Sequence, residues 1–268
     1  MHLKNRHLDY GFHRLVDRKN KQKASFMEID LDLWKAKENE ELTYQVAKNE
    51  ETAILLLTGN ASLELNGKKI TLKRSNIFEQ RTKLILLKQE QSVAIKTKKD
   101  SKFLFITTDN KTLDKNYVYD KSNSREEFFG ADKWEQVAKR KVRTFFDYHT
   151  NPKSNLVVGE VITYQGKWSS YLPHHHPQPE MYFFQFEKDS AFGLSVAGDE
   201  AYIVKNDDVN AVEGGLVHPV SAAPGYPLYY CWIIKHLKNN PWVDRIEAEE
   251  HLWLNKKNPK YWKEKNEF

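Results

Sequence analysis

Residues 169–186 read SSYLPHHHPQPEMYFFQF, and this stretch decides how the chain is interpreted. His174, His175 and His176 stand side by side, and Glu180 follows four residues after the last of them. Side chains alternate between the two faces of a β-strand, so His174 and His176 share one face and His175 points away. The two prolines of PQP disfavour a continuing strand and predict a tight connection. A hairpin at this point would bring Glu180 opposite His176, so that three metal-ligand side chains share one face.

A fourth candidate ligand, His218, occurs in the segment GGLVHPVSAAPGY. It follows a Gly-Gly turn and opens another apolar stretch, which could pair beside the first hairpin. Three imidazoles and one carboxylate would leave one or two positions open, as is typical of a catalytic metal. This donor set contains no thiolate and suits Zn²⁺, Mn²⁺, Fe²⁺, Ni²⁺ or Co²⁺ without choosing among them. An isolated His-X-His is as often an ordinary surface strand, and the spacing to Glu180 is what favours a metal site.

The composition is that of a folded protein with one large domain or two of the usual size. The 42 Lys and Arg exceed the 37 Asp and Glu by only five, and the basic residues form no single stripe, so we expect no nucleic-acid partner. No apolar run approaches the ~20 residues that cross a bilayer, and MHLKNRHLDY lacks the apolar region of a signal peptide. The single cysteine, Cys231, excludes an intrachain disulfide and is expected in the core. These features predict a cytoplasmic location without a membrane partner.

Short runs rich in Val, Ile, Leu, Tyr and Phe recur between turn signals, a pattern that predicts an all-β protein. Asn66-Gly67 lies between two such runs, as a type I′ hairpin turn requires. The strand-like runs fall into two blocks, and helix is expected only in the stretch between them, over 132–142, and in the tail. The predicted division is an N-terminal barrel at 1–108, a linker at 109–150, a C-terminal metal-binding barrel at 151–237 and a C-terminal arm at 238–268.

The two blocks have similar lengths and a similar order of features, which indicates an internal duplication. Matching ETAILLLTG to EMYFFQFEK places Gln45 and Ala47 where His174 and His176 stand in the second block. Only Glu51 would remain as a ligand in the first block, and one carboxylate does not hold a metal. The sequence therefore predicts that the N-terminal barrel is structural.

The pattern H-X-H-X₃-E with a distant histidine resembles the metal motif of the cupin superfamily. The chain departs from that motif in two places, because no glycine lies six residues before His174 and no proline precedes the glycines of VEGGLVHPV. More specifically, NLVVGEVITYQGKWSSYLPHHH, EMYFF and HPVSAAPGYPLYY look like the 5-deoxy-glucuronate isomerase family of bacterial inositol catabolism. LLLTGNASLEL and RSNIFEQRTKLILL of the first block are similar to that family too, so the resemblance runs from about residue 25 to about residue 237.

This resemblance implies a bicupin, with two tandem double-stranded β-helix (jelly-roll) barrels. It implies a metal-dependent aldose–ketose isomerase that converts 5-deoxy-D-glucuronate to 5-dehydro-2-deoxy-D-gluconate, with the related uronate ketol-isomerases as siblings. The family's metal ligands carry over to His174, His176, Glu180 and His218, which would hold one divalent ion. The expected partner is a small sugar acid, and a homo-oligomer is compatible with the resemblance.

Ketol isomerisation moves a proton or a hydride between adjacent carbons while negative charge builds on two oxygens, which a divalent ion stabilises. The proton route needs a base, and the candidates are Glu160, Tyr182 and Tyr229. Glu160 lies in the apolar run VVGEVITY, where a carboxylate must either face solvent or be used. An arginine fork suits the carboxylate of a uronate. Arg140 or Arg143 of KRKVRTFF could provide it, and a solvated charge in the linker is the alternative.

Two other functions are compatible with the same metal shell, because fold does not fix function. An Fe²⁺ dioxygenase would consume oxygen, whereas an isomerase would turn over unchanged under nitrogen. A non-catalytic sugar-binding protein would use the metal only as an anchor and would bind without turnover.

Overall fold

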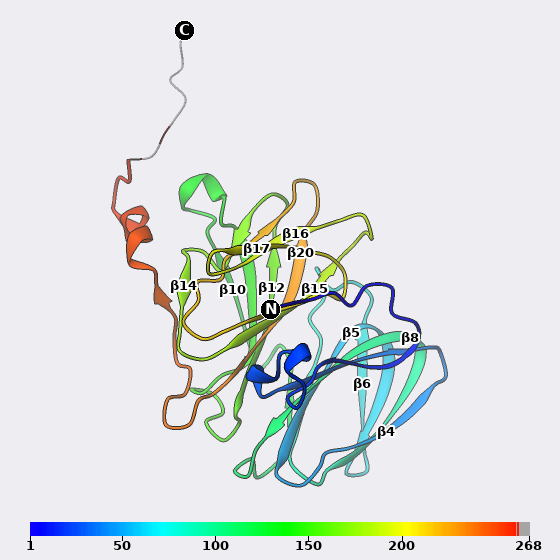
Figure 1. Ribbon diagram of the computed structural model, residues 1–268. Helices are drawn as coiled ribbons and strands as arrows, with labels where there is room; N and C mark the ends of the chain where they lie inside the picture. Colours follow the sequence, from blue (N-terminus) through cyan, green and yellow to red (C-terminus); the bar gives the residue numbers. More distant parts are fainter. Residues whose placement is uncertain (261, 263–268) are drawn as a thin grey trace.

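The computed structural model describes residues 1–260 and 262, and this part of the chain is almost entirely β (Figure 1). The predicted all-β class is therefore confirmed. Four short 3-10 turns complete the secondary structure of this part: η1 (Lys21–Lys23), η2 (Ser25–Met27), η3 (Trp134–Gln136) and η4 (Glu249–Asn255). The helix expected over 132–142 is reduced to η3. Residue 261 and residues 263–268 of the predicted arm lie outside the described residues.

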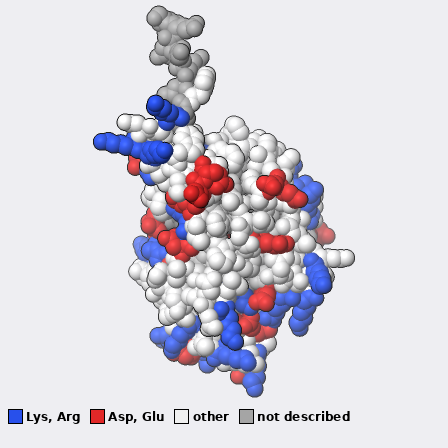
Figure 2. Space-filling model, turned by 60° about the vertical axis from the view of Figure 1, so that its left-hand side comes forward, with Lys and Arg blue, Asp and Glu red and all other residues white. Residues whose placement is uncertain are grey.

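No helix in the described part of the chain is both long and apolar enough to cross a membrane. On the face shown in Figure 2, Lys and Arg side chains are interspersed with Asp and Glu around the edges and do not gather into one stripe.

An eight-stranded antiparallel sheet forms what we call the N-terminal module. Its strands are β2 (Gly11–Val16), β3 (Asp30–Ala36), β4 (Glu41–Gln45), β5 (Glu50–Leu65), β6 (Lys68–Arg74), β7 (Leu84–Leu87), β8 (Ser92–Asp109) and β9 (Tyr117–Tyr119). Leu65 pairs with Lys68 across the two-residue loop between β5 and β6. Both loop residues, Asn66 and Gly67, have positive φ (51° and 72°), as a type I′ turn requires. The predicted hairpin turn is confirmed.

Three sheets form the C-terminal module. The large sheet runs in the order β1 (His2–Leu3), β18 (Val209–Val212), β15 (Glu180–Phe186), β20 (Leu228–Lys235), β12 (Leu156–Thr163), β11 (Arg140–Phe146) and β10 (Arg125–Phe129). The second sheet runs in the order β13 (Trp168–Ser169), β19 (Val220–Ala222), β16 (Gly193–Ala197) and β17 (Glu200–Val204). The third pairs β14 (His174–His175) with β21 (Ile246–Glu247).

The stretch 109–150, expected to be an irregular linker, contains regular strands. It contributes β9 to the N-terminal module and β10 and β11 to the large sheet of the C-terminal module. The strand β10, REEFF, lies at the edge of its sheet, where charged residues are tolerated and protect against further pairing. The first strand, β1, also joins the C-terminal module. The division into domains at residues 108, 150 and 237 stays a prediction.

The two modules share a strand order, with β3-β8-β5-β7 in one and β12-β20-β15-β18 in the other. This order matches β5 to β15, the strand that begins with Glu180. Glu51 lies on the face of β5 that also carries Ala53 and Leu55, whereas Thr52 lies on the other face, toward the module interior. The proposed match of Glu51 to Glu180 is therefore displaced by one residue. Gln45 and Ala47 are exposed rather than interior.

The central strands are buried on both faces. In β15, Met181 and Phe183 belong to an apolar layer that also contains Leu31, Leu55 and Leu104 of the N-terminal module. The alternate residues Tyr182, Phe184 and Phe186 belong to a second apolar cluster inside the C-terminal module. This two-sided burial explains why EMYFFQF is a continuous apolar run rather than an alternating one. We call the first of these clusters the inter-module layer.

A buried ion pair joins the two modules within this layer. Glu160 of β12 is inaccessible to solvent, and its Oε1 and Oε2 lie 2.5 and 3.1 Å from Nη1 and Nη2 of Arg74 of β6. The Tyr229 hydroxyl donates a 2.8 Å hydrogen bond to Oε1, and Arg143 Nη1 lies 3.4 Å from Oε2. Burial opposes the charged carboxylate, yet the pairing with Arg74 outweighs it, and the pKa of Glu160 is lowered. Glu160 is therefore a paired carboxylate.

Replacing Glu160 with Gln should destabilise the protein, because Arg74 and Arg143 would remain buried without their shared counter-charge. Breaking a buried pair on one side costs roughly 3–5 kcal/mol of unfolding free energy. Urea denaturation followed by intrinsic fluorescence measures this loss. The matched control is Glu41→Gln, which removes an exposed pair with Lys96 and should change stability little. Equal stability of Glu160→Gln and the parent would contradict the structural role.

Candidate metal centre and pocket

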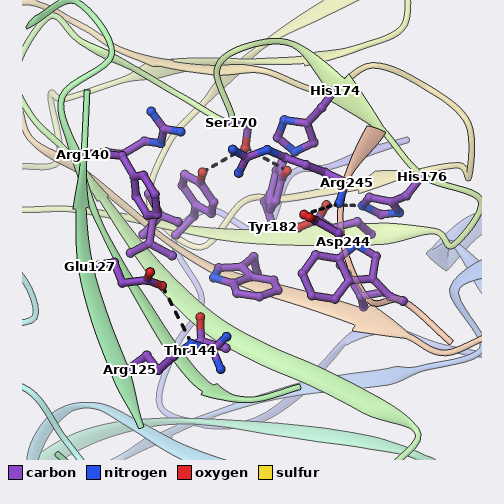
Figure 3. Close-up of a pocket in the computed structure, with 18 residues that line it drawn as sticks. Arg125, Glu127, Arg140, Thr144, Ser170, His174, His176, Tyr182, Asp244 and Arg245 are labelled. Atoms are coloured by element: carbon purple, nitrogen blue, oxygen red, sulfur yellow. Dashed lines mark hydrogen bonds and ion pairs between the residues drawn. The ribbon is translucent and has the colours of Figure 1, made fainter. Parts of the chain in front are cut away.

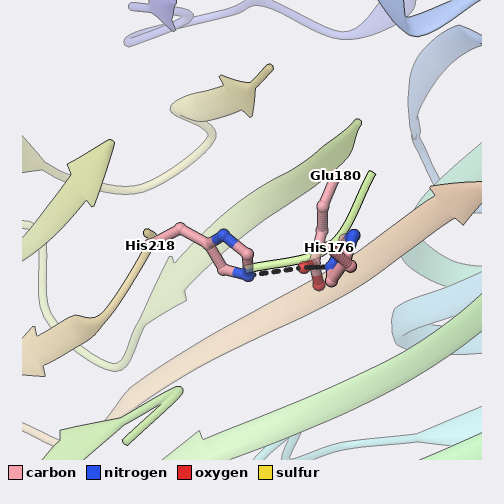
Figure 4. A group of neighbouring side chains, drawn as sticks. All are labelled: His176, Glu180 and His218. Atoms are coloured by element: carbon pink, nitrogen blue, oxygen red, sulfur yellow. Dashed lines mark hydrogen bonds and ion pairs between the residues drawn. The ribbon is translucent and has the colours of Figure 1, made fainter. Parts of the chain in front are cut away.

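Three predicted ligands converge at the start of β15 (Figure 4). Nε2 of His176 and Nε2 of His218 each lie 3.1 Å from the same oxygen of Glu180, Oε2. All three residues are buried, and together they could hold a metal ion. The hairpin predicted from the sequence, with Glu180 brought back beside His176, is the arrangement found.

His174 lies beside this group. Its ring centroid is 4.9 Å from that of His218 in an edge-on arrangement, and it lines the same pocket as His176 and Glu180. His175 is half-buried, pairs with Ile246 of β21 and is absent from the pocket lining. The predicted separation of His174 and His176 from His175 is therefore present in the described structure. The role of His174 as a ligand stays a prediction.

The ring orientation of the histidines is fixed by backbone carbonyls. In each ring Nδ1 lies within hydrogen-bond distance of a main-chain oxygen: His174 with Leu172 at 2.9 Å, His176 with Gln178 at 2.9 Å and His218 with Leu216 at 2.7 Å. A carbonyl oxygen can only accept, so Nδ1 carries the proton and the neutral ring presents a lone pair at Nε2. Two such lone pairs and a carboxylate oxygen then face one another. A cation among them removes this conflict, so the donor set fits a metal ion.

Burial and the mutual contacts of these residues shift their pKa values. Burial and the neighbouring His218 lower the pKa of His174 to about 3, so this imidazole stays neutral. Burial also disfavours the charged form of His218, but contact with Glu180 outweighs it and raises the pKa of His218. Burial opposes the charge on Glu180 as well, yet contacts with His176 and His218 lower the pKa of that carboxyl well below its usual range. Glu180 is therefore ionised and could act as an anionic ligand.

The Gly-Gly turn before His218 has a steric reason. A Cβ at Gly214 would lie 2.0 Å from the carbonyl oxygen of Pro177, so only glycine lets the two loops meet. At this contact Gly215 N–H donates a 2.8 Å hydrogen bond to the carbonyl of His176. The loops that carry His176 and His218 are thereby held against each other.

A cavity of about 170 Å³ opens beside the three ligands (Figure 3). The strands β11, β15 and β20 and the C-terminal segment build its walls. Its lining residues are Arg125, Glu127, Phe129, Arg140, Val142, Thr144, Val161, Ser170, His174, His176, Glu180, Tyr182, Tyr230, Trp232, Ile234, Trp242, Asp244 and Arg245. One wall depends on Gly159, because a Cβ there would lie 2.4 Å from the ring of Trp232.

Arg140, predicted to bind a substrate carboxylate, lines this pocket and is only 4% exposed. It donates to the carbonyls of Ala138 (2.9 Å) and Tyr171 (2.7 Å), and no carboxylate of the described residues lies within ion-pair distance of it. Burial lowers the pKa of Arg140 to about 10, and the nearby charge of Arg245 adds to this effect. A buried cation without a counter-charge makes this end of the pocket suitable for an anion.

Hydroxyl groups line the pocket next to Glu180. Ser170 Oγ lies 3.2 Å from the hydroxyl of Tyr182 and 3.2 Å from that of Tyr230. Burial, together with the charge of Glu180, raises the pKa of Tyr182 well above its usual value. Tyr182 therefore keeps its proton and can donate it to an oxygen in the pocket.

Three other predicted site residues lie elsewhere. Glu160, Tyr229 and Arg143 belong to the buried charge cluster of the inter-module layer and are absent from the pocket lining. The reason is strand alternation, because Val161 faces the pocket and its neighbour Glu160 faces the other way. The prediction that these three contact the sugar receives no support from this placement.

Several pocket residues were missed by the sequence reasoning. Tyr230 and Trp232 lie two residues apart on β20, and the alternation of YYCWII could have shown that they share a face. Ser170 stands in the quoted stretch but carries no distinctive spacing. Arg245 lies in the polar C-terminal segment, where no pattern in the sequence marks it.

A family model described as the KduI/IolB family matches residues 3–254. The chain belongs to the KduI/IolB family. A 5-deoxy-glucuronate isomerase of Geobacillus thermodenitrificans is 36% identical over 118 residues, which cover 35% of this chain and 43% of that relative. A 5-deoxy-glucuronate isomerase of Shouchella clausii is 30% identical over 129 residues, which cover 39% and 47%. These matches span less than half the length of either relative. The family resemblance inferred from the sequence is confirmed.

Solved structures show the same fold. An IolB-like protein from Salmonella typhimurium superimposes with a TM-score of 0.81 at 21% identity, covering 94% of this chain and 98% of that one. An oxalate decarboxylase of Lactobacillus farciminis superimposes with a TM-score of 0.64 at 12% identity, covering 91% and 86%. At these identities the likeness concerns the fold alone.

Replacing His176 with Ala should abolish metal retention, because its Nε2 would be lost from the convergent group. His175→Ala is the matched control and should retain the metal, since this ring lies outside the convergent group of His176, Glu180 and His218. Elemental analysis after gel filtration measures the difference. Acidification should also release the metal from the parent, because protons compete with the metal for the imidazole nitrogens. Equal metal loss in the two variants would contradict the alternation of the strand.

Proposed function

We propose that this protein is a metal-dependent aldose–ketose isomerase that converts 5-deoxy-D-glucuronate to 5-dehydro-2-deoxy-D-gluconate in myo-inositol catabolism. The observation that carries the proposal is the convergence of His176, Glu180 and His218 beside a pocket that also contains the Arg140 cation, which has no carboxylate within ion-pair distance in the described part of the chain. The proposal includes His174 as a fourth ligand and one divalent ion, without a choice among Zn, Mn, Fe, Ni and Co. The names of the curated relatives support the substrate.

Substrate orientation follows from the two ends of the pocket. The carboxylate of the uronate binds the guanidinium of Arg140, which two backbone carbonyls hold in place. The aldehyde end then points toward the histidines and Glu180. The indole rings of Trp232 and Trp242, with centroids 5.8 Å apart, add an apolar surface to the pocket lining.

A bound divalent ion would supply Lewis-acid stabilisation of the negative charge that develops on the two oxygens of the reacting carbons. Of the three residues predicted for proton transfer, Tyr182 is the one that lines the pocket. Its protonated hydroxyl donates to a sugar oxygen, and Ser170 holds the hydroxyl in position. The hydrogen that moves between the carbons travels as a proton or as a hydride, and the residues allow both routes.

We also propose that the protein is cytoplasmic and that its physiological partner is a small sugar acid. Assembly into a homo-oligomer is part of the same proposal. The single cysteine, Cys231, is buried and free, which supports a reducing compartment.

The proposal is tested by assaying 5-deoxy-D-glucuronate turnover before and after chelation, in air and under nitrogen. We expect turnover that stops on chelation, returns with added metal and is unchanged under nitrogen. Oxygen consumption would instead indicate a dioxygenase, and binding without turnover a sugar-binding protein. A parallel assay with 5-keto-4-deoxyuronate separates the proposed activity from that of the sibling ketol-isomerases.

Replacing Tyr182 with Phe should lower kcat by roughly 100-fold, because the pocket would lose its proton donor. Metal content should remain that of the parent, since the hydroxyl is not part of the ligand group. Tyr202→Phe is the control, because that hydroxyl bonds Glu200 at the surface. An unchanged kcat in Tyr182→Phe would remove this residue from the mechanism.

A further inference from the structure

The C-terminal segment 236–248 contributes to the pocket lining and is fixed at both ends. At one end His236 N–H donates a 2.8 Å hydrogen bond to the carbonyl of Asn155. At the other end Glu247 of β21 is the strand partner of His174 of β14, and Ala248 N–H donates a 2.9 Å hydrogen bond to the carbonyl of Pro173. Between these anchors Trp242, Asp244 and Arg245 reach the pocket lining. The segment is thus part of the site rather than a loose tail.

Arg245 and Arg140 bring two positive charges to the same pocket. Figure 3 shows Arg245 extending from its segment toward Ser170, beside His174 and on the side of Arg140. Arg245 is close enough to disfavour the charge on Arg140. Like charges held together in a partly dry pocket are unfavourable unless an anion lies between them.

The pocket's own carboxylates leave this pair of cations uncompensated. Glu127 and Asp244 both line the pocket, yet within the described chain neither forms an ion pair with Arg140 or Arg245. Glu127 lies nearest to Arg125, at 3.9 Å. Glu180 is occupied by His176 and His218. An anionic ligand is therefore the group that the two guanidinium groups lack.

We propose that Arg245 is a specificity-determining residue that binds the carboxylate of the substrate together with Arg140. The inference rests on the proposed function for the identity of the substrate, but its chemistry requires only a sugar acid. Arg140 is buried and uses two of its N–H groups on backbone carbonyls, so it offers a fixed half of the clamp. Arg245 is exposed and comes from the C-terminal segment, so it offers the second half. Two guanidinium groups on one carboxylate select an acid over a neutral sugar of the same shape.

The test compares D-glucuronate with D-glucuronamide as probes, because they differ mainly in the charge at C6. Isothermal titration calorimetry of the metal-loaded full chain gives Kd for each probe. The parent should bind the acid more tightly than the amide. Arg245→Gln should weaken binding of the acid by roughly tenfold and leave the amide unchanged, since a charge-assisted hydrogen bond is lost. With 5-deoxy-D-glucuronate the same variant should raise KM while kcat and metal content stay near those of the parent.

Lys238→Gln is the matched control, because it removes one positive charge from an exposed residue of the same segment that is absent from this pocket. It should leave the acid-to-amide ratio at the parent value. An unchanged ratio in Arg245→Gln, or a parent that does not prefer the acid, would overturn the clamp. A parent that prefers the acid through Arg245 but does not isomerise 5-deoxy-D-glucuronate would refute the proposed function and leave the clamp standing.

Discussion

The burial of β12, β15 and β20 on both faces is the constraint on which the rest of the structure depends. Every second residue of these strands belongs to the inter-module layer, and the residues between them face the interior of the C-terminal module. In β15, Met181 and Phe183 face the inter-module layer, whereas Glu180 and Tyr182 face the pocket. Glu180 and Tyr182, to which we assign ligand and donor roles, therefore lie on a strand whose reverse side is packed against another sheet. A shift of β15 by one residue would turn the Glu180 carboxylate into the apolar inter-module layer and Met181 toward the pocket.

The ion pair of Arg74 and Glu160 lies on the other side of the same sheet and also restricts how its strands can be placed. Buried ion pairs add little net stability, because desolvation offsets most of the attraction between the charges. A mismatched register would leave one of these charges unpaired in an apolar layer, which is far more costly. We therefore interpret the pair as fixing how β6 and β12 face each other. The pocket receives its geometry from this register, although neither residue lines it.

The sequence was sufficient for the features that depend on local patterns. Alternation along the strand and the two prolines after His176 predicted the hairpin of His176 and Glu180, and Asn66-Gly67 predicted the turn between β5 and β6. It was insufficient where the answer depends on how distant strands pair. Glu160 lies directly opposite Cys231, and this register turns the carboxylate toward Arg74 instead of toward the metal site. Arg245 could not be predicted either, because only the folded segment brings it to the pocket.

The loops around the predicted ligands are as much a part of the candidate metal site as those ligands. His174 and His218 each bond the carbonyl two residues earlier, and His176 bonds the one two residues later. Each loop therefore sets the tautomer of its own histidine, and prolines at 173, 177, 179 and 219 restrict the loop backbones further. Because Glu247 pairs with His174, the segment that carries Arg245 is attached to one of these loops. The proposed substrate contact of Arg245 and the orientation of the His174 ring thus depend on the same backbone pairing.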